Sequence, residues 1–530
     1  MSFDPKPYEV GLALLHWLAV FGSCLAIVFI VSLSSALALG RAGDVINAIT
    51  SGIGDFLSTS PRRIFAIGLL TFREAIRRKA LLVFFVFAAL FMFAGWFLSN
   101  ASSRPDLQAK AYVVFVLTSI SFLILPVVLL LACWGVPEDI RLRSMHTVVT
   151  KPIRRHEIVC GRMLGYSIVG TIVLVLMGVI GYVWIFRQVA DDAKQNLVAR
   201  VPVYGQLTFM SREGSEAKSG INTGDIWDFR SYIEGATKAR AIWKFENVNA
   251  DRIGDQLVLE TKFEAFRTHK GDINKGLLGR LIFVNPSKNI KVPHKPFEVK
   301  EYRENKMTIE RKLTLIEENT GKVLEYDLFN DLVVDNTLTV EVQCLDAGQY
   351  LGMARPDLFV RLPDRHFAVS YSKSIVGIWL LMNMIIMLGV SVSCFVKGPV
   401  ATLVVFTFLI IGQGLREFMG RVVSGAEKGS GLFESVYRLI NHMNPVTELD
   451  ESPVTKVILS VDWVFKQMLW LVQHVIPDFS FYRMSPYVAN GFDVSWQAAM
   501  LPSLLITLGY VLPCILIGYY TLRFRELEAK

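Results

Sequence analysis

The chain has 530 residues, of which 52% are hydrophobic and 19% charged, with a mean hydropathy of +0.41. This composition is too apolar for an ordinary soluble protein and too charged for a chain that lies in the membrane throughout. The formal net charge of +8 does not indicate a nucleic-acid partner, because the Lys and Arg residues gather beside apolar runs. We therefore expect a mixed membrane architecture that binds no nucleic acid.

Seven apolar runs are candidates for membrane crossing, since about 20 apolar residues in a helix span the hydrocarbon core. They are Gly11–Leu39, Ala80–Leu98, Tyr112–Trp134, Leu164–Phe186, Ser374–Phe395, the shorter Val400–Leu415 and Trp496–Leu522. None contains Asp, Glu, Lys or Arg, which argues against ion-coupled transporters and proton pumps. The polar residues inside the runs, including Ser119, Ser121, Thr171 and Asn383, are interpreted as helix-packing residues and not as substrate ligands.

The basic residues that flank these runs predict the orientation of the chain. The segments 62–79, 141–162 and 523–530, together with Lys397, all fall on one side if every run crosses once. By the positive-inside rule that side is cytoplasmic. We expect an integral protein of a bacterial-type cytoplasmic (inner) membrane with its C-terminus in the cytoplasm. Ala36–Ala38 resembles a signal-peptide cleavage site, but the preceding run is too long and has only Lys6 as a cation, so an uncleaved helix is preferred.

The organisation along the chain follows from these assignments. We expect an extra N-terminal transmembrane helix at 1–40, a cytoplasmic linker and amphipathic elbow helix at 41–79, and the first half of a transmembrane core at 80–186 with a cytoplasmic loop at 137–163. These are followed by an extracytoplasmic β-rich domain at 187–368 and a transmembrane hairpin at 369–416. The chain then continues with extracytoplasmic or interfacial helices at 417–495 and ends in a last transmembrane helix with a cytoplasmic tail at 496–530.

The insertion at 187–368 differs from the rest because its apolar residues alternate. Alternation marks 241–245, 257–263, 281–284, 307–315 and 338–344, and turn residues occur at 247–251, 318–321 and 330–335. Short strands of this kind predict an antiparallel β-sandwich-like domain with its own core. Cys344, the one cysteine of the domain, is expected to be buried in a strand.

The sequence offers no recognisable catalytic, cofactor or metal site. His269, His294 and His366 lack paired metal-ligand spacing, and Arg155-His156-Glu157 lacks the second His of a metalloprotease helix. The carboxylates Asp225, Asp228, Asp346 and Asp357 are interpreted as a solvated face. The glycine-rich stretch 425–431 lacks phosphate-loop spacing. Any ATP hydrolysis is therefore expected in another polypeptide.

Residues 457–476 form an apolar segment that Asp462, Lys466 and His474 interrupt at intervals suited to a helix. The spacing predicts a helix with one narrow polar stripe, lying in the membrane interface or against neighbouring helices. An eighth crossing is the alternative, and it would place the basic C-terminus outside.

Two polar segments beside the second to fourth runs carry the functional prediction. In 60–79, Ile64, Gly68, Phe72, Ala75 and Ile76 lie near one helical face, which predicts an amphipathic helix on the inner leaflet. In the loop, Glu138 and Asp139 after Pro137 favour a helix N-terminus. The Arg residues at 141, 143, 154 and 155 can pair with an acidic partner or with anionic lipid. The alternatives are a merely positive-inside loop and an Arg73–Glu74 pair within the elbow.

The segment 71–79 (TFREAIRRK), together with Glu138, Thr147, Lys151-Pro152, Arg155-x-Glu157 and Gly161, resembles the permease subunits of ABC-2-type exporters. Ser144-Met-His stands where a Gly is usual, and Arg162 replaces a Lys. The resemblance implies an interfacial elbow helix, a six-helix core made by the second to seventh runs, and a short helix near 138–151 that docks on an ATPase. The implied coupling residues are Glu138, Asp139, Arg141, Arg143, Thr147, Lys151, Pro152, Arg154, Arg155 and Glu157, with Phe72, Arg73, Glu74, Arg77 and Arg78 in the elbow.

The expected function is therefore that of a membrane permease subunit. It would couple ATP hydrolysis by a separate ABC-type ATPase to export of a substrate or to movement of its extracytoplasmic domain. Its partners would be that ATPase, the lipid bilayer and a second permease in a homodimer or heterodimer. A membrane-anchored envelope binding or structural protein is the alternative.

Overall fold

The computed structural model describes residues 8–38, 42–77, 85–87, 89–90, 105–141, 153–217, 219–221, 230–267, 276–300, 303–316, 323–424, 431–444, 447, 449–450 and 452–524. These residues form two compact units. The β unit comprises Val198–Ser370 with Gly491–Asp493, and the helical unit contains the remaining described residues. The inserted domain predicted from alternation is thus a structural unit of its own.

The helical unit contains six described helices that are long and apolar enough to cross a membrane. They cover Val10–Ser34, Leu107–Arg141, Arg155–Gln188, Phe367–Ser393, Gly398–Ser424 and Trp496–Arg523. Six of the seven predicted runs are therefore confirmed as helices of sufficient length, while the run Ala80–Leu98 lies mostly outside the described residues. The segment 457–476 is helical, as predicted, and is not among the six.

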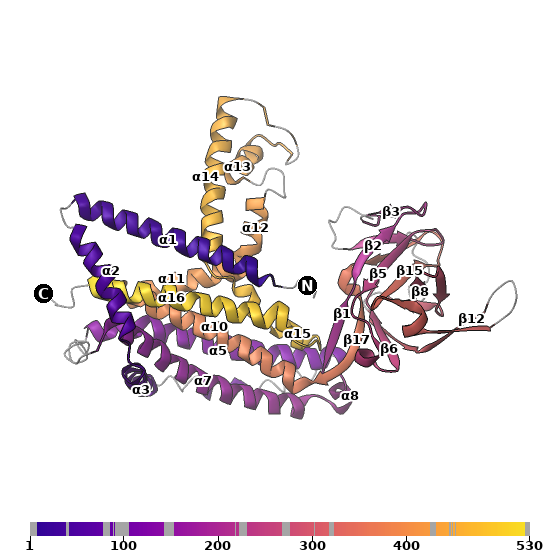
Figure 1. The fold of residues 1–530 in the computed structure, drawn as a ribbon, viewed down its shortest axis with the longest axis horizontal. Coiled ribbons are helices and arrows are strands. Elements are labelled where there is room, and N and C mark those ends of the chain that lie inside the picture. The colour runs from indigo at the N-terminus through magenta and orange to yellow at the C-terminus, as the bar shows by residue number, and fades with distance from the viewer. Residues whose placement is uncertain are drawn as a thin grey trace. The chain divides into compact units, whose positions relative to one another are not determined.

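Most of the helices are labelled in Figure 1. Their bounds are α1 Val10–Ala38, α2 Ala42–Leu57, α3 Pro61–Arg77, α5 Pro105–Arg141, α7 Arg155–Gln188, α8 Asp191–Lys194, α9 Ala250–Ile253, α10 Phe367–Ser393, α11 Gly398–Ile410, α12 Arg416–Ser424, α13 Leu432–Ile440, α14 Pro453–Val475, α15 Ser485–Ala489 and α16 Leu501–Phe524. Short 3-10 or π turns cover η1 Leu328–Leu332, η2 Arg355–Asp357, η3 Ile411–Leu415, η4 Phe479–Tyr482 and η5 Trp496–Met500.

Polar residues inside the long helices pack helix against helix. The Trp379 indole of α10 donates to the Thr171 hydroxyl of α7 over 2.8 Å, and the Ser167 hydroxyl donates to the Asn383 side chain over 2.5 Å. Gly170 makes room for Met382 between these bonds, because a Cβ there would lie 2.4 Å from the Met382 sulfur. The predicted packing role of Thr171 and Asn383 is confirmed.

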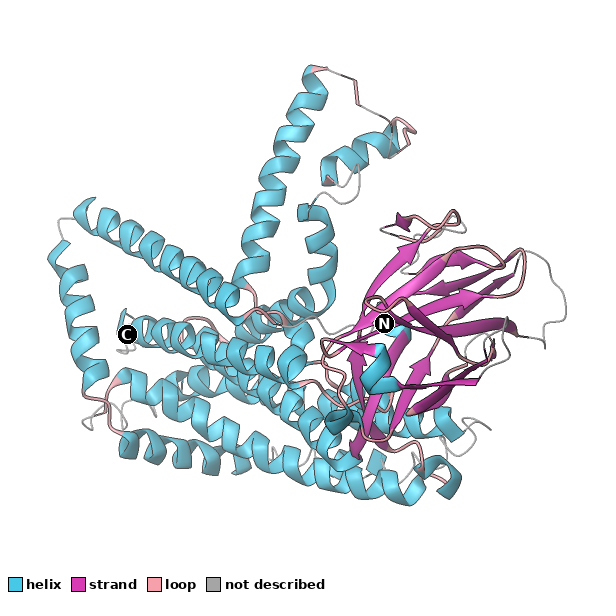
Figure 2. Ribbon diagram, turned by 45° about the vertical axis from the view of Figure 1, so that its right-hand side comes forward, coloured by secondary structure: helices cyan, strands magenta, loops and turns pink. Residues whose placement is uncertain are grey.

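The β unit is built from antiparallel strand pairs (Figure 2). Its strands are β1 Val198–Tyr204, β2 Gln206–Met210, β3 Glu216–Ala217, β4 Ser231–Glu234, β5 Arg240–Phe245, β6 Gln256–Thr261, β7 Glu264–Arg267, β8 Leu277–Asn285, β9 Ile290–Pro293, β10 Phe297–Val299, β11 Asn305–Glu310, β12 Lys312–Ile316, β13 Val323–Asp327, β14 Val333–Val334, β15 Thr337–Cys344, β16 Gln349–Met353 and β17 Leu358–His366. The predicted antiparallel class is confirmed.

Two sheets supply most of the core of the β unit. One has the order β1-β17-β6-β11, and the other has the order β10-β8-β15-β5-β2-β3. Leu257 and Leu259 from the first meet Trp243, Phe283 and other buried residues of the second in one apolar cluster. Side chains two apart in a strand share a face, so the alternation seen in the sequence places them together. Full burial of each contributes roughly 1.5–3 kcal/mol.

Cys344 ends β15 and is fully buried, as predicted. Burial raises the pKa of its thiol to about 11. The thiol is therefore protonated at neutral pH and is a packing residue of the core.

Two local predictions in the β unit are only partly right. The alternating segment 307–315 is extended as predicted, but it forms two strands, because the chain leaves β11 at Glu310 and starts β12 at Lys312. The turn predicted at 330–335 overlaps the π turn Leu328–Leu332, whose Leu328 and Leu332 are both buried in the core, and the short strand β14. The reversal itself falls at Asp335 and Asn336, which both have positive φ and precede β15.

The predicted solvated face of carboxylates is also wrong for Asp357, which is 5% exposed. Its Oδ2 accepts hydrogen bonds from Arg230 Nε at 2.7 Å and from the Ala354 N–H at 2.8 Å. The hydrogen bond to Asp357 raises the pKa of the Arg230 guanidinium. Asp346 Oδ2 accepts from the Leu278 N–H at 2.7 Å. Both carboxylates hold the backbone of the unit in place, while Asp225 and Asp228 lie outside the described residues.

Candidate functional site

The candidate site is the end of the helical unit where α5 stops and α7 starts. The helix α5 continues through Pro137 to Arg141, and α7 begins at Arg155. Glu138 and Asp139 therefore lie in the last turn of a helix, and the predicted helix N-terminus at this point is wrong. The burial of Val136 and the ion pair of Asp139 stabilise the helix on both sides of Pro137, against the low helix propensity of proline.

A buried Arg joins three helices at this end. The Arg162 guanidinium of α7 donates one hydrogen bond to Glu74 Oε2 of α3 at 2.6 Å and a second to Asp139 Oδ2 of α5. The Arg162 and Asp139 side chains are each 7% exposed. A buried charge needs such pairing, since an unpaired one costs several kcal/mol. Glu74 thus has a partner on another helix, whereas a pair with the neighbouring Arg73 is the alternative predicted from the sequence.

A third carboxylate, that of Glu157, binds the backbone at the N-terminus of α3. Glu157 Oε1 accepts from the Ser60 N–H at 2.8 Å and from Arg63 at 3.1 Å, and Oε2 accepts from the Arg154 N–H at 3.0 Å. The Glu157 side chain is fully buried. A negative charge here satisfies the free N–H groups at the start of α3 and of α7 and complements both helix dipoles. Glu157 is therefore bound within the chain.

Between these two ion clusters, α3 and α7 pack with their backbones close together. Ile67, Gly68, Thr71 and Ala75 form the buried face of α3. A Cβ added at Gly161 would lie 2.6 Å from Ile67 Cβ, and one at Gly165 would lie 2.6 Å from the Gly68 carbonyl oxygen. Small residues four apart allow this approach. The predicted elbow helix is confirmed as a helix, but Ile76 of its predicted face is exposed.

Two further helices, α2 and α16, contribute side chains at the same end of the helical unit. Asp55 of α2 binds Arg154, the residue just before α7, at 3.1 Å and accepts a 2.7 Å hydrogen bond from the Tyr519 hydroxyl of α16. The His156 ring lies 4.7 Å from Phe56, and its Nε2 is 2.8 Å from the Thr59 hydroxyl. Together α2, α3, α5, α7 and α16 form one polar cluster, which we call the clamp.

The clamp brings together four of the predicted site residues: Glu74, Asp139, Arg154 and Glu157. Arg155 also binds within the chain, donating to the Arg523 carbonyl at 2.8 Å, so the expectation that Arg154 and Arg155 bind a partner or lipid is not supported. Glu138 and Arg141 pair with each other at 2.6 Å at the surface. Phe72, Arg73 and Arg77 lie on α3, and Arg78, Arg143, Thr147, Lys151 and Pro152 lie outside the described residues.

Sequence reasoning missed Asp55, His156 and Tyr519 as members of the clamp, and it interpreted Arg162 as a flanking basic residue and as a departure from a motif. It also missed α2 as a helix. The apolar residues Val45, Ile49, Ile53 and Phe56 recur every three or four positions and could have revealed this helix. No local signal marks the Asp55–Arg154 pair.

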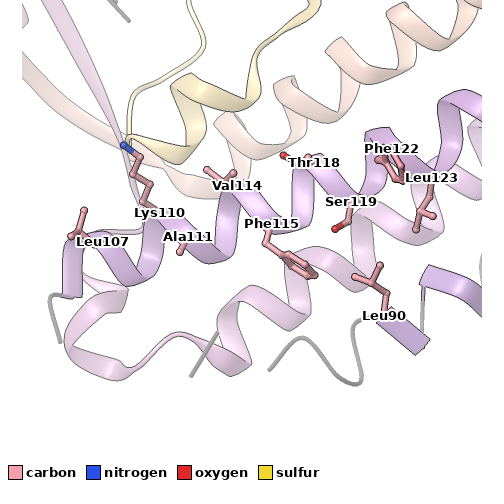
Figure 3. A pocket seen from close by; sticks show the side chains of 10 residues that line it. All are labelled: Leu90, Leu107, Lys110, Ala111, Val114, Phe115, Thr118, Ser119, Phe122 and Leu123. Carbon is pink, nitrogen blue, oxygen red and sulfur yellow. The ribbon is translucent and has the colours of Figure 1, made fainter. Parts of the chain in front are cut away.

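An apolar hollow of about 650 Å³ lies elsewhere in the helical unit, along α5 (Figure 3). Its lining side chains are Leu90, Leu107, Lys110, Ala111, Val114, Phe115, Thr118, Ser119, Phe122 and Leu123. Lys110 is the one charged group among them, and the lining has no carboxylate or imidazole for acid–base chemistry. The hollow suits an apolar chain better than a reacting polar substrate.

Within the described residues, no group of three or more His, Cys, Asp or Glu side chains could hold a metal ion. The acids and bases of the clamp are paired with one another. In comparisons with known proteins, no family model, no curated protein and no solved structure matches the chain.

Proposed function

We propose that this chain is the membrane-spanning permease subunit of an ABC transporter, driven by a separate ATPase subunit that docks on residues 137–163. The observation that supports this most is the clamp. It binds the chain on both sides of the segment 142–152, through Asp139 before it and through Arg154, Glu157 and Arg162 after it.

The contacts of the clamp connect the ends of α5 and α7 to α3, so that a force on one of these helices is transmitted to the others. A partner that displaces the segment 142–152 pulls on the end of α5 and the start of α7, which are tied to α3 by Arg162 and by glycine-mediated packing. Closely packed helices with buried ion pairs move as one body, since their interiors compress little. The arrangement therefore suits an element that passes a push from one side of the membrane into several helices at once.

The output of that movement is either export or mechanotransmission. The second candidate has a specific observation in its favour: the chain enters the β unit after α7 and α8 and returns from it into α10. The two helices also contact each other, for example through the Tyr371 hydroxyl, which donates to the Gly178 carbonyl at 2.8 Å. Movement of α7 against α10 would then reach the β unit even without a transported substrate.

Charge reversal at the exposed end of α5 tests ATPase docking. Glu138 and Arg141 pair at the surface, with side chains 23% and 74% exposed, so changing them leaves the buried clamp intact. We expect Glu138→Lys and Arg141→Glu each to abolish co-purification of the tagged full chain with a co-expressed ABC-type ATPase from the same genome. Arg212→Glu in the β unit, at a side chain 69% exposed, is the matched control and should leave co-purification unchanged.

Unchanged co-purification and ATP hydrolysis in both α5 variants would contradict docking at this position. If no ABC-type ATPase co-purifies with the unmodified chain, the structural or binding alternative replaces the permease assignment.

A further inference from the structure

A row of three polar side chains crosses three neighbouring strands of the β unit, β5, β15 and β8 (Figure 1). Gln343 of β15 is paired with Arg280 of β8. On the other side of β15 the register pairs Val342 with Ala241 of β5. Arg240, the residue before Ala241, therefore lies beside Gln343. Partners in antiparallel strands are about 4.5–5.5 Å apart between Cα atoms, so the two Arg residues flank Gln343 at a Cα separation of roughly 10 Å.

The three side chains point away from the apolar core of the β unit. Val342, next to Gln343 in β15, is buried in that core, as are the neighbours of both Arg residues in their strands. Successive residues of a strand face opposite sides of the sheet. Arg240, Gln343 and Arg280 therefore share the outer side, where all three are partly buried. We call these three residues the arginine row.

Neither Arg of the row has a carboxylate partner among the described residues. Arg240 donates two hydrogen bonds, both from Nη1, to the carbonyl oxygens of Thr237 at 2.8 Å and of Ala239 at 2.7 Å. Burial lowers the pKa of Arg240, and the neighbouring Glu341 offsets this effect only in part. The Nε of Arg280 is buried and has no hydrogen-bond partner in the described part of the chain. Both cations thus lack the pairing that burial of a charge normally requires.

Other partly buried Arg residues of the β unit have such partners. Arg200, Arg230 and Arg361, with side chains 13%, 26% and 14% exposed, each form ion pairs with two carboxylates. Carboxylate pairing is therefore the way in which this domain accommodates guanidinium groups that are partly removed from water. The arginine row departs from that way.

Carboxylates that lie near the row in the sheet are bound to other cations. Glu341, on the same face of β15 as Gln343, binds Lys291 at 3.1 Å. Glu298 of β10, the strand next to β8, binds Lys300 at 3.2 Å. The row therefore keeps an excess of positive charge, held on two planar guanidinium groups with an amide between them.

We propose that the arginine row binds an oxyanion, the phosphate or carboxylate group of a ligand of the β unit. Guanidinium groups suit such a group because their N–H donors form a planar fork that matches its oxygen atoms. The carboxamide of Gln343 supplies a further N–H donor between them. The bound anion takes the place of the carboxylate that Arg240 and Arg280 lack. This inference does not depend on the proposed function.

Isothermal titration calorimetry of the full chain in detergent tests the proposal, with inorganic phosphate and acetate as probes. We expect saturable binding of at least one probe, and the tighter of the two identifies the group that the row binds. Arg240→Gln and Arg280→Gln should each weaken that binding by roughly tenfold or more, the effect of losing one charge-assisted hydrogen bond. Arg252→Gln, at an exposed Arg of α9, is the matched control and should leave binding unchanged.

Gln343→Glu distinguishes a lost site from a misfolded domain. The new carboxylate lies between the two guanidinium groups and supplies the missing anion from within the chain. We expect this variant to bind neither probe and to unfold at a higher temperature than the unmodified chain, whereas misfolding would lower that temperature.

Three results would overturn the proposal. The first is the absence of saturable binding of both probes to the unmodified chain. The second is an equal loss of binding in Arg252→Gln and in the two row variants. The third is an unfolding temperature that does not rise in Gln343→Glu, because the row would then need no anion.

Discussion

Replacing Arg162 with Met is expected to lower the free energy of unfolding of the helical unit by about 3–5 kcal/mol, the usual cost of breaking a buried ion pair by removing one partner. Met keeps an unbranched apolar side chain but removes both hydrogen bonds, so Asp139, with a side chain 7% exposed, loses its guanidinium partner. The measurement is the midpoint of unfolding in mixed detergent and lipid, followed by the loss of helical circular dichroism.

Two companion variants separate pairing from packing in this test. Arg141→Met removes an Arg–carboxylate pair at the surface of α5, where such pairs contribute about 0–1 kcal/mol. Adding Asp139→Asn to Arg162→Met removes the negative charge of Asp139 and should recover part of the lost free energy of unfolding. If Arg162→Met and Arg141→Met shift the midpoint equally, the buried clamp does not hold the helices together.

A methyl group at Gly165 is expected to lower the free energy of unfolding by about 1–3 kcal/mol, the usual cost of overpacking. In Gly165→Ala the new Cβ would lie 2.5 Å from Thr71 Cβ and 2.6 Å from the Gly68 carbonyl oxygen of α3. Neither contact can be relieved by a flexible side chain, so α3 must move away from α7. The same unfolding midpoint measures the effect.

The matched control lies on the same helix. Gly178→Ala would place its Cβ 3.4 Å from Ile375 Cδ1, close to ordinary van der Waals contact with a flexible atom. We expect a much smaller shift for Gly178→Ala. Equal shifts for the two Ala variants would mean that helix propensity, and not the approach of α3, decides the stability.

The sequence revealed elements whose signal is local. Apolar length predicted the long helices, alternation predicted β5, β6, β8 and β15, and the spacing of Asp462 and Lys466 predicted α14 as a helix with one polar stripe. Spacing cannot tell which way such a stripe faces. In the structure Asp462 is buried against α13, whereas Lys466 is only partly buried.

The clamp could not be predicted, because its contacts join distant parts of the chain. Arg162 meets Glu74 across 88 positions, and Tyr519 meets Asp55 across 464. Each of these residues taken alone is an ordinary charged or aromatic residue beside an apolar run. The same limit explains Asp357, whose partner Arg230 lies 127 positions away.

Photo-crosslinking in intact membranes tests directly whether the proposed ATPase docks on this chain. A benzophenone amino acid at position 141, at the exposed end of α5, lies within the proposed docking residues 137–163. The same group at position 306 of the β unit is the control. We expect a crosslink to the co-expressed ABC-type ATPase from position 141 and none from position 306. A crosslink from position 306 alone, or from neither position, would contradict docking on residues 137–163.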